Sequence, residues 1–125
     1  MTEIIEFVEA RLAERAAEAP LVHVLGCDAH SPCPDGCCPM GTCDCGEPER
    51  ILADIATKRQ IVHWCANEVL RDVDLTGMDQ PGWSVRAAAP GRHVEVFTAA
   101  FTLRAIATAF AAHPEFKPEW STNRC

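Results

Sequence analysis

Features that mark several large protein classes are missing from this sequence of 125 residues. No run reaches the roughly 18 apolar residues that a membrane span needs, so no contact with a bilayer is expected. The opening residues 1–6 carry acids where a secretory signal or a transit peptide carries bases. The sequence therefore favours a cytoplasmic protein.

Basic side chains are also scarce: 11 Lys and Arg stand against 18 Asp and Glu, and the net charge is −7. A protein that binds duplex nucleic acid needs clustered bases to displace counterions from phosphate, and no such cluster exists here. Direct nucleic-acid binding is not expected. The acidity is compatible with a surface that faces a protein partner, or simply with solubility.

Motifs that identify common enzymes are absent as well. The chain has no phosphate-binding Gly loop, no HExxH, no GxSxG and no pair of carboxylates that one face would bring together. His63 and Cys65 are the nearest base and nucleophile, but residues two apart on a helix point in different directions. Cys65 falls on an apolar stripe and is expected to be buried, whereas His63 is expected at the surface. We therefore expect no enzymatic activity.

Hydrophobic periodicity predicts an all-α protein, a single domain over residues 1–125 with three main helices. The first helix spans residues 2–18, where apolar residues recur every fourth position and Pro20 ends the pattern. The second spans 48–71 and the third 94–112. The predicted buried stripe of the second is Ile51, Leu52, Ile55, Val62, Cys65, Ala66 and Val69. That of the third is Val96, Phe97, Ala100, Phe101, Leu103, Ala107 and Phe110.

Two shorter segments carry weaker patterns. Residues 83–87 and 93–96 flank Pro90 and Gly91 and can pair as a small β-hairpin. Phe116 and Trp120, in the tail after the third helix, are expected to pack onto the core.

Reactive and metal-binding side chains are concentrated in a Cys-rich loop, residues 26–47, between the first two predicted helices. Six of the eight cysteines fall between Cys27 and Cys45, and the loop holds almost no apolar side chain besides Met40. Such a segment cannot bury a core, so something else must order it. In a reducing cytoplasm disulfides do not persist, and clustered thiolates more often hold metal, whose binding supplies folding free energy. The sequence thus predicts a metal-binding loop.

Thiolates and imidazoles are the usual zinc ligands, four to each ion in a closed structural site. The predicted ligands of a single Zn²⁺ are Cys33, Cys38, Cys43 and Cys45. A second Zn²⁺ would add Cys27, His30 and Cys37, and His23 could complete that set. The spacing C-x5-C-x3-C-C-x4-C-x-C lacks the usual CxxC knuckle. An iron–sulfur cluster and a loop of free or oxidised thiols therefore remain as alternatives.

Three helical stretches resemble a family of small uncharacterised proteins from actinobacteria and their phages. One is residues 48–62, from Pro-Glu-Arg-Ile-Leu to Lys-Arg-Gln-Ile-Val. Another consists of residues 103–107 and 110–120, and includes His-Pro-Glu-Phe at 113–116 and Trp120. Residues 7–12 are the third. The family's cysteines lie nearer its C-terminal helix, so the metal prediction rests on this sequence alone. The family has no established activity, so the resemblance implies no catalytic residue.

Together these features predict a zinc-stabilised, non-enzymatic interaction module. The resemblance implies an accessory protein of phage or actinobacterial origin that binds a host protein or a larger assembly, in the host cytoplasm or in a virion. One alternative is a structural component of the virion held by copies of itself, so a homo-oligomer is also possible. The other is a thiol-based redox or metal sensor, because crowded thiolates release metal when they are oxidised.

Overall fold

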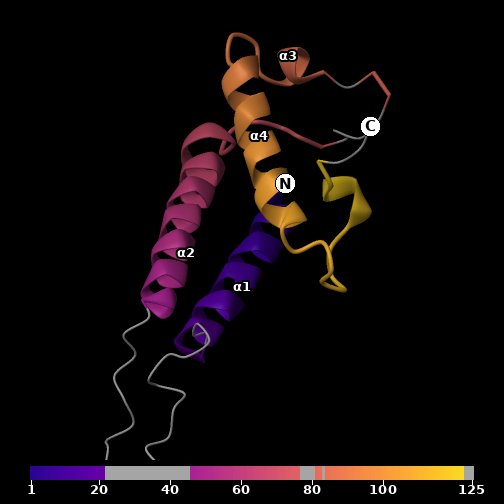
Figure 1. The fold of residues 1–125 in the computed structure, drawn as a ribbon. Coiled ribbons are helices and arrows are strands. Elements are labelled where there is room, and N and C mark those ends of the chain that lie inside the picture. The colour runs from indigo at the N-terminus through magenta and orange to yellow at the C-terminus, as the bar shows by residue number, and fades with distance from the viewer. Residues whose placement is uncertain (22–45, 77–80, 83, 123–125) are drawn as a thin grey trace, which may run out of the picture. The chain divides into compact units, whose positions relative to one another are not determined.

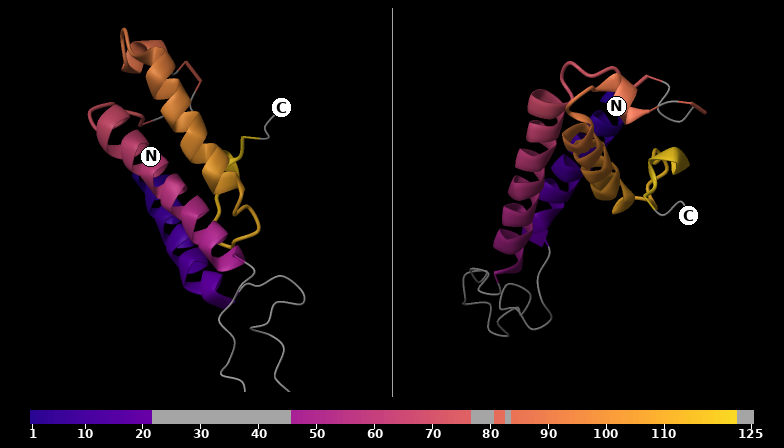
Figure 2. Two further views of the ribbon diagram at one scale, coloured as in Figure 1. Left: turned by 60° about the vertical axis from the view of Figure 1, so that its left-hand side comes forward. Right: turned by 90° about the horizontal axis from the view of Figure 1, so that it is seen from above.

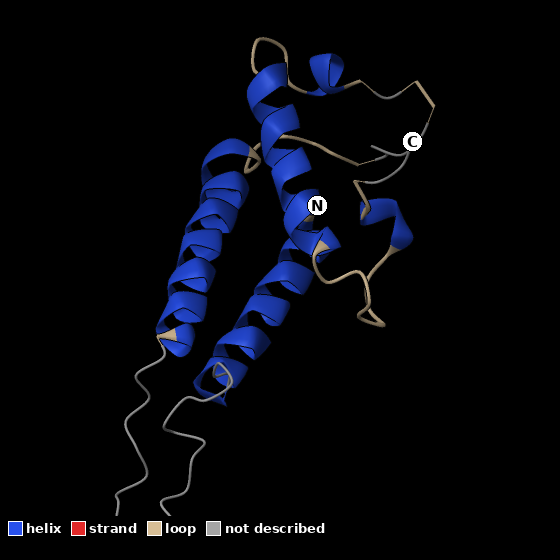
Figure 3. Ribbon diagram, in the orientation of Figure 1, coloured by secondary structure: helices blue, strands red, loops and turns tan. Residues whose placement is uncertain are grey.

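The computed structural model describes residues 1–21, 46–76, 81–82 and 84–122. Within these residues every regular element is helical and no strand occurs, so the all-α prediction is confirmed (Figures 1 and 3). The α-helices are α1 (Thr2–Glu18), α2 (Glu47–His63), α3 (Val85–Ala88) and α4 (His93–Thr108). Two 3₁₀ turns, η1 (Ala19–Leu21) and η4 (Pro118–Trp120), and a π-helix, η3 (Trp64–Val69), complete the order. No helix in the described part is long and apolar enough to cross a membrane.

The chain divides into two compact units, which we describe separately. The larger unit joins Met1–Arg11 to Lys58–Cys125. In this helical bundle α4 packs against η3, α3 and η4. Its core is apolar, and each fully buried aliphatic side chain stabilises the fold by about 1.5–3 kcal/mol. The core residues of the larger unit are Ile4, Phe7, Val8, Val62, Cys65, Val69, Leu70, Leu75, Ala89, Val96, Ala99, Ala100, Leu103, Ala107 and Trp120.

The smaller unit, Leu12–Thr57, contains the last turns of α1 and the first turns of α2. Figures 1 and 2 show these turns side by side in every view. Leu12, Ala19 and Ile55 are its buried apolar side chains. Gly46 precedes α2 with a φ of 72°, a left-handed conformation that glycine adopts without a steric penalty. Its carbonyl then accepts the first hydrogen bond of the helix, from the Arg50 amide at 3.0 Å.

The second predicted helix forms at nearly the expected place, but its last part is a π-helix. After His63 the backbone widens, and the Leu70 amide donates to the Cys65 carbonyl at 2.9 Å. A π-turn holds one more residue than an α-turn, so its hydrogen bond joins residues five apart. Cys65 and Leu70 are both buried, at 0% and 7% exposure. Leu52, predicted for the buried stripe, is instead 43% exposed.

The predicted β-hairpin is wrong for the residues that the structure describes. Val85–Ala88 forms the short helix α3, and the second predicted strand, residues 93–96, is the first turn of α4. A helix forms there because four buried residues follow one another at helical spacing from Val96 onward: Val96, Ala100, Leu103 and Ala107. α4 itself ends at Thr108, four residues before the predicted end, and turns follow up to Glu115.

Candidate functional site

The predicted metal ligands cannot be placed. All seven lie outside the described residues: Cys27, His30, Cys33, Cys37, Cys38, Cys43 and Cys45. His23 lies outside them too. In the part of the chain that is described, no three His, Cys, Asp or Glu side chains gather as a metal site would require. The zinc site therefore stays a prediction from the sequence.

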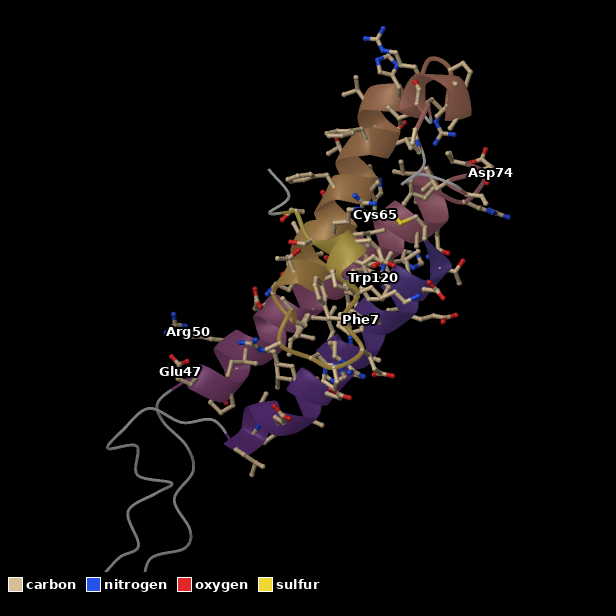
Figure 4. The ribbon with its side chains drawn as sticks, turned by 90° about the vertical axis from the view of Figure 1, so that its right-hand side faces the viewer. Phe7, Glu47, Arg50, Cys65, Asp74 and Trp120 are labelled. Atoms are coloured by element: carbon tan, nitrogen blue, oxygen red, sulfur yellow. The ribbon has the colours of Figure 1, made fainter. Side chains whose placement is uncertain are left out.

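The smaller unit defines where the Cys-rich loop is attached. Residue 21 ends the described chain after α1, residue 46 resumes it before α2, and both lie at the same end of this helix pair (Figures 1 and 2). Glu47 and Arg50 form an ion pair at 2.8 Å on the first turn of α2 (Figure 4). Because the helices already hold the two attachment points together, closing the loop costs less chain entropy than in a free peptide.

The most elaborate polar site in the described residues surrounds Arg11, on α1 in the larger unit. Arg11 is buried, at 8% exposure, although it is charged. Its Nη1 lies 2.7 Å from Nδ1 of His113, close to Nε2 of the same ring, and donates to Glu115 Oε2 at 3.1 Å. Buried charges are stable only where such partners replace water. Arg11 therefore links α1 to the segment after α4, more than a hundred residues away.

An aromatic cluster lies beside this polar site. The Phe7 ring, on the preceding turn of α1, has its centroid 5.1 Å from that of Trp120 and 6.1 Å from that of Phe116 (Figure 4). The Arg11 guanidinium carbon lies 5.3 Å from the Phe7 centroid, within the range of a cation–π contact. The prediction that Phe116 and Trp120 pack onto the core is therefore confirmed. Trp120 is buried, and Phe116 is half-buried.

An exposed ion pair adds a second link between the same segments. Lys117 Nζ donates to Glu3 Oε2 at 2.6 Å. The hydrogen bond and the charge of Lys117 lower the pKa of the Glu3 carboxyl, and the hydrogen bond to Glu3 raises the pKa of Lys117. The residues around these links line an open groove, which includes Glu6, Ala10 and Pro118. Acids and bases are mixed along it, so its electrostatics favour no single sign of ligand charge.

His63 and Cys65, the nearest base and nucleophile in the sequence, differ in exposure as the sequence predicted. Cys65 is fully buried, and burial raises the pKa of its thiol, so the reactive thiolate is disfavoured. His63 lies at the surface, where Nδ2 of Asn67 lies 3.0 Å from its Nδ1 and donates to its carbonyl at 3.1 Å. This geometry lacks the contact between base and nucleophile that activates a cysteine.

Sequence reasoning missed Arg11 as a buried residue. One local signal was available, since Arg11 follows Phe7 by four positions and adjoins the buried Leu12. His113 lies within the turns that follow α4. The contact that joins the two could not be found from local spacing.

The chain matches one protein family over nearly its whole length. The model of DUF6221, described as a family of unknown function, matches residues 1–122. The resemblance seen in the helical segments is thereby confirmed at the level of a family without an assigned function, and the phage or actinobacterial origin stays a prediction. No curated protein and no solved structure matches the chain.

Proposed function

We propose that this chain, which belongs to the DUF6221 family, is a non-enzymatic protein-interaction module whose Cys-rich loop is ordered by zinc. The observation that supports the proposal most is the density of ligands, six cysteines and His30 within residues 27–45. Soft thiolates together with imidazole select zinc over the hard cations Mg²⁺ and Ca²⁺.

The helical part of the chain supports a binding role rather than a catalytic one. Its nucleophile, Cys65, is buried with a raised thiol pKa, and its polar cluster at Arg11 joins two segments of the fold. A closed zinc site with four protein ligands leaves no open coordination position for a substrate. A loop fixed by metal loses little conformational entropy when it binds, which favours a rigid surface for a protein partner.

Native mass spectrometry with elemental analysis tests the metal, on protein purified under reducing conditions. We expect one or two Zn²⁺ per chain, with the stoichiometry reduced in Cys33→Ser and Cys43→Ser. Cys65→Ala is the matched control, because it removes a thiol that lies in the helical core rather than in the loop. Disulfide masses without zinc, or an equal loss of zinc in the control, would contradict the proposal.

The binding role needs its own experiment. Residues 27–45 are replaced by a Gly/Ser linker, and pull-downs from a candidate host lysate are compared for this variant, the zinc-loaded protein and the chelated protein. We expect specific partners with the zinc-loaded protein alone, and helical circular dichroism that is largely kept in all three samples. Complete unfolding of the linker variant would instead assign the loop a purely structural role.

A further inference from the structure

The last turns of α1, which lead into the Cys-rich loop, contribute little to the core of the smaller unit. Leu12 and Ala19 are fully buried. Of the six residues between them, Ala16 is half-buried and the other five are exposed. A helix end with few buried apolar contacts opens locally at a low cost in free energy.

The first turns of α2, which follow the loop, are held by a similarly small core. Pro48 and Ile55 are buried and Ile51 is half-buried. The ion pair between Arg50 and Glu47 adds little, because the Arg50 side chain is 78% exposed and water screens its charge. The two helix ends that flank the loop therefore share the same weakness.

Both helix ends belong to the smaller unit, Leu12–Thr57, and the Cys-rich loop lies in the same stretch of sequence. A unit of fewer than about 70 residues seldom obtains enough stability from a hydrophobic core alone, and natural ones often add a structural metal. The donor set of the loop, thiolates with imidazole, suits Zn²⁺. The small core of the described helix ends and this donor set thus point to the same source of stability.

We infer that zinc binding in the Cys-rich loop controls how often the two flanking helix ends, residues 12–21 and 46–57, open. The inference rests on the proposed function, because it requires the metal. An ion held by several loop residues cross-links the connection between α1 and α2, so the helix ends gain less chain entropy when they open. Without the ion, the small core alone keeps them closed.

Two consequences distinguish this control from a general stabilisation of the chain. Coupling between two equilibria is reciprocal, so any change that opens the helix ends must also weaken zinc binding. α4 of the larger unit should not respond to the metal, because its own core residues Val96, Leu103 and Ala107 are fully buried. Metal loading then regulates the order of the surface beside the loop that the proposed partner contacts.

Hydrogen exchange followed by mass spectrometry tests the inference on the full chain. Zinc-loaded protein is compared with protein stripped by a chelator under reducing conditions, and native mass spectrometry measures the zinc in each sample. Without zinc we expect amides of residues 13–19 and 49–55 to exchange at least about 10-fold faster. Amides of residues 96–107, the internal control, should change by less than about 2-fold. Brief openings of this kind leave helical circular dichroism largely unchanged.

A core substitution outside the loop tests the reciprocal effect. Ile55→Ala removes a buried side chain of the smaller unit, and the zinc dissociation constant, measured by competition with a chelating dye, should rise about 5-fold or more. The matched control is Leu103→Ala, which removes a side chain of the same size from α4 and should leave the zinc affinity unchanged. If Leu103→Ala fails to fold, Val96→Ala replaces it as the control.

The possible failures can be told apart. A zinc-bearing protein whose helix-end amides exchange equally fast with and without the ion would overturn the inference and leave the zinc-binding proposal standing. So would an equal acceleration at residues 96–107, or a zinc affinity that Ile55→Ala leaves unchanged or that both variants weaken equally. Native mass spectra without zinc would overturn both the inference and the proposed function.

Discussion

Replacing Arg11 with Ala tests whether the buried guanidinium holds the C-terminal segment onto α1. Hydrogen bonds that involve a charged group contribute about 1.5–3 kcal/mol, and Arg11 bonds His113 and Glu115 while it lies over Phe7. Glu115 is 70% exposed and can hydrate once it is released, which reduces the loss. We expect the free energy of unfolding to fall by about 2–3 kcal/mol, which lowers the melting temperature by roughly 5–10 °C in a chain of this size.

Urea unfolding followed by circular dichroism measures this change, and the slope of free energy against urea should stay the same. The matched control is Arg15→Ala, which removes an exposed arginine one turn later on the same helix. Its effect should stay within about 0.5 kcal/mol. Hydrogen exchange gives a local reading, because amides of residues 113–120 should lose protection first in Arg11→Ala. If the two variants were equally stable, the cluster would have no stabilising role and our reading of the buried charge would be refuted.

Three further predictions concern the same unit. Phe7→Ala should cost about 3–4 kcal/mol and reduce the near-ultraviolet signal of Trp120, whose ring it contacts; an unchanged signal would contradict the aromatic cluster. The Cys65 thiol, buried and with a raised pKa, should resist thiol reagents until the protein unfolds, and mass mapping of the labelled sites checks this. The pKa of Glu3 is lowered and the pKa of Lys117 is raised, so their pairing stabilises the fold between pH 4.5 and pH 10.5. This stabilisation is lost as the pH falls through the lowered pKa of Glu3. It is also lost as the pH rises through the pKa of Lys117, which lies above 10.5. A carbon NMR titration should therefore give a Glu3 midpoint below 4.5 that returns toward 4.5 in Lys117→Met.

The helices could be predicted from the sequence because burial along a helix repeats every three or four residues. The first helix was expected at residues 2–18 and α1 is Thr2–Glu18, with Ile4, Val8 and Leu12 buried as the spacing indicated. The second was expected to begin at residue 48, and α2 begins one residue earlier, at Glu47. These signals are local, and local spacing is enough to identify them.

The predicted hairpin failed for a local reason too. Short segments rich in valine fit a strand and a helix equally well, and Pro-Gly between them suggested a turn. The structure instead uses Gly91, at a φ of 77°, to reverse the chain between α3 and α4. The helical stripe that begins at Val96 runs on for three turns, and its burial outweighs the strand preference of two valines.

The polar cluster at Arg11 could not be predicted in this way. Its partners lie more than a hundred residues away, and their contact depends on how the chain after α4 returns to α1. The cysteine loop presents the opposite case. There the sequence predicts the ligands, and all of them lie outside the described residues.

The exposed rings of α4 show a further limit of hydropathy patterns. Phe97 and Phe101 were assigned to the buried stripe because apolar residues at helical spacing normally face the core of their own chain. In the structure both side chains remain more than half exposed. A pattern of hydrophobic residues predicts which surfaces are buried away from water, but it does not predict whether the same chain or another one covers them. The mistaken assignment therefore follows from one property of α4: it carries apolar side chains on more than one side, and the core of the larger unit buries only those on one of them.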